Sequence, residues 1–358
     1  MLQHLAYLHD SELVARFQRR CGLVLMECGG REPRGREPPV RNRPLHFLFL
    51  LSAGLGHELF YITCLPCVHW SLDPFLCRRL VNMWTLVMYV GQVMKDVLKL
   101  PRPLSPPVVK LEPRVDAEYG LPSTHAMAAT AISFTVLLSA PSRIQFQFEV
   151  GLLIALTLSS LVCLSRLYTG MHSVLDVLCG ALISASILFL TFPYWEAFDR
   201  LQLTSPVSPV AALSLPLLLS YTYPAPDGRS TTRGDTTTIL GAAAGSSVGY
   251  WANERLGRTF EPPLARLPVA LSAPTAGALA AGAARFLVGA AALLATRQAA
   301  KTLSLRALRA WYRVPERDAE RARRRREIEV PYKFVTYTAV GLVNSMVVSR
   351  VFALLGIL

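Results

Sequence analysis

Long apolar runs recur along almost the whole chain and restrict its fold more than any other feature. A helix needs about 20 apolar residues, at roughly 1.5 Å each, to cross the hydrocarbon core of a bilayer. Segments that meet or approach this length are 46–66, 80–100, 123–140, 149–166, 173–193, 206–222, 237–254, 275–296 and 333–357. The sequence therefore predicts an all-α fold, a polytopic membrane helical bundle of about nine transmembrane helices.

Two of these segments have unusual compositions for a spanning helix. Pro209 and Pro216 interrupt the run at 206–222. The run at 237–254 is rich in Gly, Ala and Ser, which suits close helix packing better than contact with lipid. Both are still predicted as spans.

Composition and charge exclude several classes of protein. Hydrophobic residues make up 52% of the chain and charged residues only 17%, whereas soluble domains carry about 25% charge. The net charge of +13 lies mostly at the N-terminus and in 297–333, without any nucleic-acid motif. We therefore predict contact with anionic membrane lipid and no nucleic-acid partner. Cys64 and Cys67 form an isolated C-x2-C, so no metal site is predicted.

The pair His172 and Asp176 carries the first chemical signal. Residues four apart lie on the same face of a helix, so the carboxylate can accept a hydrogen bond from one ring nitrogen. The other nitrogen then keeps its lone pair, which suits a nucleophile that attacks phosphorus. Residues 168–171 are expected to form a turn into a helix beginning near Ser173, and a helix start favours anions.

A second motif, Pro122-Ser123-Thr124-His125, reads as the start of a helix. Ser123 or Thr124 is the expected N-cap, and the Ser123 hydroxyl can also contact a phosphate. The ordinary pKa of a histidine is about 6.5, so His125 can protonate a leaving alkoxide and then accept a proton from water.

Three cations complete the inventory. Lys95 lies late in an apolar run, and a charge there is costly unless it is paired. Asp96 is one candidate partner and a bound phosphate is the better one. Pro101 and Pro103 are expected to end this helix around Arg102. Arg102 and Arg166 can each grip phosphate oxygens with a planar fork that Lys lacks.

The three motifs, K-x6-R-P, P-S-x-H and S-R-x5-H-x3-D, resemble the type 2 phosphatidic acid phosphatase (PAP2) superfamily in their order and in their position at the ends of apolar runs. The usual P-S-G-H of that superfamily is P-S-T-H here, with Thr124 in place of Gly. The segments 91–99, 118–130, 163–172, 235–240 and 327–334 resemble more specifically the sphingosine-1-phosphate phosphatases. Residues 13–23 resemble the second of the two vertebrate isoforms.

This resemblance implies a role for each site residue. His172 forms a phosphohistidine, Asp176 orients it, and His125 is the general acid and then the base. The phosphate-binding residues implied are Lys95, Arg102, Ser123, Thr124 and Arg166. The resemblance implies no metal and no cofactor, a lipid phosphate substrate, and a multi-pass protein of the endoplasmic reticulum membrane.

The chain divides into three predicted regions. Residues 1–45 form a polar basic arm, in which 11–17 read as a short amphipathic helix for the membrane surface and 28–44 as a flexible stretch. Residues 46–200 form the PAP2-type catalytic core. Residues 201–358 supply further transmembrane helices and a basic loop at 297–332. The sequence identifies no protein partner.

Two other functions use the same residues. A sugar phosphatase of the glucose-6-phosphatase type shares the three motifs and the nine-span layout, although the residues around the motifs favour a lipid substrate. A non-catalytic lipid-binding protein need not retain both histidines and all three cations. Acidic residues of the loop before His125 (Glu112, Asp116 and Glu118) can supply a counter-charge for a substrate amine or can simply be solvated.

The side of the membrane is predicted differently by two arguments. Counting basic residues places the N-terminal arm, the site and the loop 297–332 in the cytosol. The resemblance places the active site and N-terminus in the lumen, and catalytic cations inflate the basic count of the site loops. We therefore predict a lumenal site.

Overall fold

The chain is described from a computed structural model that covers residues 2–23, 40–112, 118–224, 230–270, 273 and 275–357. Nearly all of the regular structure is helical. The helices are α1 (Leu2–His9), α2 (Ser11–Arg20), α3 (Arg43–Leu55), α4 (Glu58–Ser71), α5 (Pro74–Leu98), α6 (Thr124–Ser139), α7 (Phe148–Tyr168), α8 (Val174–Thr191), α9 (Trp195–Thr204), α10 (Ser208–Tyr221), α11 (Thr232–Arg255), α12 (Ala276–Trp311), α13 (Ala319–Ala322), α14 (Arg326–Leu342) and α15 (Ser349–Leu354). Two short strands, β1 (Ile144–Gln145) and β2 (Val269–Ala270), pair in parallel.

Helix α5 begins and ends where local chemistry dictates. The Asp73 side chain accepts a 2.9 Å hydrogen bond from the Phe75 N–H, which caps the first turn. At the other end Lys99 adopts a left-handed conformation with φ of 52°, and Pro101 follows. The predicted end of this helix before Arg102 is confirmed.

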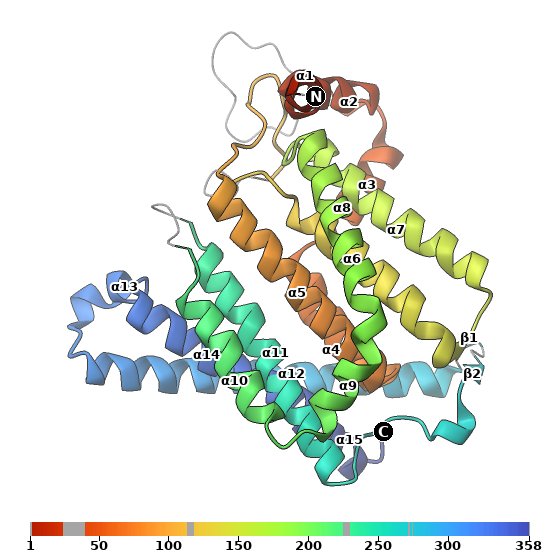
Figure 1. Ribbon diagram of the computed structural model, residues 1–358, viewed down its shortest axis with the longest axis vertical. Helices are drawn as coiled ribbons and strands as arrows, with labels where there is room; N and C mark the ends of the chain where they lie inside the picture. The colour runs from red at the N-terminus through yellow and green to blue at the C-terminus, as the bar shows by residue number, and fades with distance from the viewer. Residues whose placement is uncertain are drawn as a thin grey trace.

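Helices α5, α6, α7 and α8 form one bundle, in which α6 packs against each of the other three. Helix α11 packs against α14, α10 and α5, and so joins the C-terminal half to this bundle. Figure 1 shows α12 crossing the lower part of the view at a steep angle to α5 and α8. The C-terminal half therefore contacts α5 through α11.

Large apolar side chains are exposed on the outer faces of α7 and α8. Leu153 is 66% exposed, Leu182 66% and Phe189 80%. Exposed apolar surface on this scale needs an apolar environment. The chain is therefore a membrane protein.

The count of nine spans is not confirmed. By length and composition, four helical stretches in the described residues can cross a bilayer: Phe148–Tyr168, Val174–Thr204, Ala276–Trp311 and Arg326–Leu354. The pair α3 and α4, bent by 67° at its break, makes a fifth if it is counted as one span.

The other predicted spans are helical but shorter or more polar. Helix α10 has 14 residues and α6 has 16. Helix α5 buries two arginines as well as Lys95 and Asp96, and α11 buries several threonines and Asn253. Apolarity along the sequence alone did not separate helices that face lipid from helices that are enclosed by others.

The N-terminal region docks on α7 and α8. The helix predicted over 11–17 is confirmed as α2, and its Val14, Ala15 and Gln18 are buried. The Gln18 amide donates to the carbonyls of Val109 and Tyr168 at 2.7 and 2.8 Å. The buried face of α2 therefore contacts the protein. The flexible stretch predicted at 28–44 lies mostly outside the described residues.

Candidate active site

The ends of four helices bring the three sequence motifs together. The motifs lie at the C-terminal ends of α5 and α7 and at the N-terminal ends of α6 and α8, on the side of the bundle covered by α1 and α2 (Figure 1). The Ser123 N–H donates a 3.0 Å hydrogen bond to the Asp176 carbonyl, which ties the start of α6 to the start of α8. The predicted gathering of the motifs at one face of the bundle is thus observed.

His172 and Asp176 are enclosed at the start of α8. They are 1% and 0% exposed, and His172 Nδ1 lies 3.6 Å from Asp176 Oδ2. Asp176 Oδ2 also accepts a 2.7 Å hydrogen bond from the Ser173 N–H, while Ser173 Oγ accepts from the Asp176 N–H at 3.2 Å. This reciprocal pair is a capping box, and the spacing Ser173-x-x-Asp176 was its sequence signal. Asp176 therefore fixes the helix start as well as facing the imidazole.

The charge state of His172 follows from its surroundings. Burial, then the positive charges of Arg102, Arg166 and Lys95, hold the pKa of His172 well below its ordinary value. Its imidazole is therefore neutral at neutral pH. With Nδ1 facing Asp176, the free lone pair belongs to Nε2.

Lys95 is paired with Glu118, not with Asp96. The Lys95 ammonium lies 3.1 Å from Glu118 Oε2 and its side chain is 2% exposed. Asp96 instead accepts hydrogen bonds from the hydroxyls of Tyr223 at 2.7 Å and Thr232 at 2.5 Å. The interpretation of Asp96 as a partner for Lys95 is wrong, because neighbouring residues on a helix point in different directions.

Arg102 connects the loop before α6 to the residue that precedes His172, the candidate nucleophile. Its Nε donates to the Glu118 carbonyl and its Nη1 to the Met171 carbonyl, both at 2.9 Å. Its Nη2 lies 3.6 Å from Glu118 Oε2. Burial lowers the pKa of Arg102 to about 10, and the Lys95 charge holds the pKa of Glu118 below its ordinary value.

Arg166 is held by a second carboxylate of the same loop. It is 1% exposed and forms a forked pair with Glu112, with contacts of 2.8 and 3.2 Å. Within the described residues Arg166 Nε, His172 Nδ1 and Asp176 Oδ1 are buried without hydrogen-bond partners. They are three of seventeen such side-chain atoms among the described residues.

The P-S-T-H motif behaves as predicted at the helix start. Ser123 caps α6 by accepting a 3.4 Å hydrogen bond from the Ala126 N–H, and both Ser123 and Thr124 are buried. His125, half-buried in the first turn, packs against the break between α3 and α4. A Cβ added to Gly56 would lie 2.6 Å from His125 Cδ2. The backbone at Gly56 therefore lies directly against the imidazole of His125, with no room for a side chain.

Several residues of the site were not singled out from the sequence. His9 Nδ1 and Ser173 Oγ lie 3.3 Å apart, which brings α1 to the residue after the candidate nucleophile His172. Gly170 has φ of +72°, and a Cβ there would lie 2.2 Å from the Val109 carbonyl oxygen. The turn before His172 therefore requires glycine, for which Thr169-Gly170 after an apolar run was an available signal.

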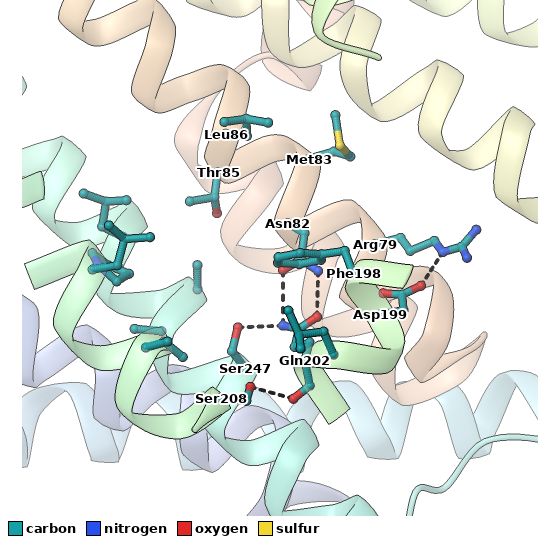
Figure 2. A pocket seen from close by; sticks show the side chains of 18 of the residues that line it. Arg79, Asn82, Met83, Thr85, Leu86, Phe198, Asp199, Gln202, Ser208 and Ser247 are labelled. Carbon is teal, nitrogen blue, oxygen red and sulfur yellow. Dashed lines mark hydrogen bonds and ion pairs between the residues drawn. The ribbon is translucent and has the colours of Figure 1, made fainter. Parts of the chain in front are cut away.

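A cavity of about 700 Å³ lies elsewhere, between α5, α9, α10 and α11 (Figure 2). It is mainly apolar, and Gln202 links Asn82 and Ser247 on one wall, with contacts of 2.9 and 2.7 Å. It contains none of the candidate catalytic residues. Arg79 on its wall and Lys95 are 16 residues apart, about 160° around α5 at 3.6 residues per turn. The cavity is therefore separate from the cationic site.

Comparison with known proteins places this site in a family. Residues 77–200, which include every candidate site residue, match the PAP2 superfamily. The chain is 52% identical to sphingosine-1-phosphate phosphatase 2 of Mus musculus and 47% identical to that of Homo sapiens, in each case over 100% of both chains. Sphingosine-1-phosphate phosphatase 1 of Mus musculus is 41% identical over 89% of this chain and 74% of its own. No solved structure matches the chain. The chain belongs to the sphingosine-1-phosphate phosphatase family within the PAP2 superfamily.

Proposed function

We propose that the chain is a lipid phosphomonoesterase that hydrolyses sphingosine 1-phosphate, and its dihydro analogue, to the long-chain base and inorganic phosphate. Its relatives carry the name of this activity. The observation that carries the proposal is a buried His172 beside the Asp176 carboxylate at one end of the bundle, where the charges of Arg102, Arg166 and Lys95 help to lower its pKa. Buried cations beside unpaired polar atoms fit an anionic substrate.

In the first step His172 Nε2 attacks phosphorus and the bond from phosphorus to the substrate oxygen breaks. His125 gives its proton to the departing alkoxide. Asp176 accepts a hydrogen bond from Nδ1 once their 3.6 Å separation closes, and so stabilises the positive charge that grows on the ring. The products of this step are the long-chain base and a phosphohistidine.

In the second step a water oxygen attacks the phosphohistidine and the nitrogen–phosphorus bond breaks. His125, now neutral, takes a proton from the water, which restores both histidines. Lys95, Arg102 and Arg166 stabilise the negative charge on the five-coordinate phosphorus in both steps. Ser123, Thr124 and the free N–H groups of their helix start contact the phosphate. We propose no metal or cofactor, because the three side-chain cations supply the charge.

We further propose that the protein is a multi-pass protein of the endoplasmic reticulum membrane with about nine spans, a lumenal site and no nucleic-acid partner. Helices such as α5, α6 and α11 then cross the bilayer largely enclosed by other helices. Exposed apolar faces on α7 and α8 support the membrane setting. The three-part division at residues 45 and 200 remains a proposal.

The function is tested by phosphate release from detergent-solubilised full-length protein in the presence of EDTA. We expect turnover of sphingosine 1-phosphate, little turnover of glucose 6-phosphate, and none of either by His172→Ala. Loss of activity with chelator would contradict the metal-free mechanism. Equal or better turnover of glucose 6-phosphate would favour a sugar phosphatase, and vanadate binding without any turnover would favour a non-catalytic binding protein.

A further inference from the structure

Two glutamates form ion pairs with the proposed phosphate-binding cations, which is unexpected for a site that binds anions. Glu118 contacts Lys95 and Arg102, and Glu112 contacts Arg166. Both glutamates come from the loop that precedes α6, and their side chains are 28% and 29% exposed. A dianionic phosphate that enters the site meets these two negative charges as well as the three positive ones.

The two glutamates hold their cations differently. Glu112 uses both carboxylate oxygens in its fork with Arg166. Both contacts of the Glu118 carboxylate use Oε2, so that among the described residues Oε1 remains for a ligand. Glu118 is also fixed through its backbone, because its carbonyl accepts from Arg102 Nε. It is therefore a positioned carboxylate directly beside two phosphate-binding groups.

Charge balance limits which phosphates fit this arrangement. Lys95 and Arg102 can turn their N–H donors to the phosphate oxygens. Glu118 then lies close to a dianionic phosphate and has lost its own positive partners. Unpaired charges in partly enclosed sites are costly. A ligand that carries its own cation next to its phosphate removes that cost. In a sphingoid-base phosphate the ammonium is on the carbon adjacent to the one that carries the phosphate ester.

We infer that Glu118 is the specificity-determining residue that binds the 2-ammonium group of the substrate, while Lys95 and Arg102 bind its phosphate. This inference rests on the proposed phosphatase function. In the free site the Glu118 carboxylate contacts two protein cations, Lys95 and Arg102. When substrate is bound, it contacts the substrate ammonium and one of these cations. Phosphate monoesters that lack the ammonium meet repulsion from the same carboxylate.

The test compares kcat/KM for sphingosine 1-phosphate with that for octadecyl phosphate, a monoester with a chain of similar length and no amine. A hydrogen bond between charged groups changes affinity by about 10- to 100-fold. We expect Glu118→Gln to reduce the ratio of the two kcat/KM values by this factor. Glu112→Gln is the matched control, since it removes the same charge from the same loop at similar exposure, and should leave the ratio within about threefold.

An unchanged ratio in Glu118→Gln, or an equal fall in both variants, would overturn the inference. A measurement on the unaltered chain covers the case in which a variant does not fold. Raising the pH from about 7 to about 10 removes part of the ammonium charge of sphingosine 1-phosphate. Titration of the protein and of the phosphate affects both substrates and cancels in the ratio, so the loss of ammonium charge should lower the ratio. A ratio that does not fall would also overturn the inference. Hydrolysis of neither substrate would instead contradict the proposed function.

Discussion

Arg102 Nη1 donates a 2.9 Å hydrogen bond to the carbonyl of Met171, the residue directly before His172. A residue of the first motif therefore fixes the backbone that carries the candidate nucleophile of the third. The same guanidinium donates through Nε to the Glu118 carbonyl. Arg102 thus joins the substrate-facing loop to the start of α8, besides contributing charge.

The charge of Arg102 should be visible in the pH dependence of activity. It helps to hold the pKa of His172 below its ordinary value, so the neutral, nucleophilic imidazole persists at pH values below about 6.5. Arg102→Gln removes one positive charge and raises the pKa of His172. We expect the acidic limb of the kcat/KM profile to move to higher pH. Arg200→Gln, at an exposed position on α9, is the control; an unmoved limb in Arg102→Gln would contradict the explanation.

Asp176 is expected to serve both catalysis and helix capping. Asp176→Asn keeps the shape of the side chain but removes the negative charge that faces the imidazole. We expect kcat to fall by about 100-fold or more, because a positioned acid–base group contributes at least about 100-fold to the rate. Ser173→Ala removes the hydroxyl that caps α8 and should reduce stability by about 1 kcal/mol. Steady-state kinetics and thermal unfolding separate the effects. Equal kcat losses in both variants would show that Asp176 acts only as a cap.

Asp96 should matter for stability more than for substrate binding. Its carboxylate joins α5 to the C-terminal half through Tyr223 and Thr232. Tyr223→Phe leaves one buried hydrogen bond unmade and should reduce stability by about 1–3 kcal/mol, with KM little changed. Thr232→Ser keeps the second hydroxyl and is the matched control. A large rise in KM without a fall in the unfolding temperature would place Asp96 in the binding site instead.

Gly170 is expected to tolerate no side chain. A left-handed backbone costs a non-glycine residue about 1–2 kcal/mol, and here a Cβ would also collide with the Val109 carbonyl oxygen. Gly170→Ala should therefore misplace His172 and abolish most activity. Gly54→Ala, where a Cβ meets nothing within 4 Å, is the control. Full activity in Gly170→Ala would show that this turn can rearrange freely.

The side of the membrane is open to a direct measurement. A glycosylation sequon engineered within 104–118, clear of the three motifs, should be modified in microsomes if the site is lumenal. A sequon that stays unmodified, together with cleavage of this loop by protease added from the cytosolic side, would reverse the prediction.

Much of the candidate site followed from local sequence signals. The Ser123 cap and the prolines after Lys99 act over a few residues and have the predicted geometry. The i,i+4 spacing brings His172 Nδ1 to 3.6 Å from Asp176 Oδ2, longer than the predicted hydrogen bond, because His172 precedes α8 instead of lying on it. The partners of the cations did not follow, because Glu118 and Glu112 lie 23 and 54 residues from Lys95 and Arg166. The contact of Gln18 with the loop near Val109 was not predicted for the same reason, because the two residues are 91 positions apart.

The predicted count of nine spans is not confirmed, for a related reason. Apolarity predicts where a helix forms but not which neighbours enclose it. Asp96 is satisfied by residues more than 120 positions away, so α5 tolerates polar residues that a lipid-facing helix would not. Short helices such as α10 show that a run of apolar residues need not be long enough to span by itself.

Trapping the covalent intermediate tests the central claim most directly. Rapid acid-free quenching of the full-length protein with substrate labelled at phosphorus should give a protein-bound phosphate that is labile to acid and stable to alkali. The label should be absent in His172→Ala. In His125→Ala, which lacks the acid for the first step and the base for the second, the label should form more slowly and persist longer. Label that remains in His172→Ala, or an active protein that never carries label, would contradict a phosphohistidine at His172.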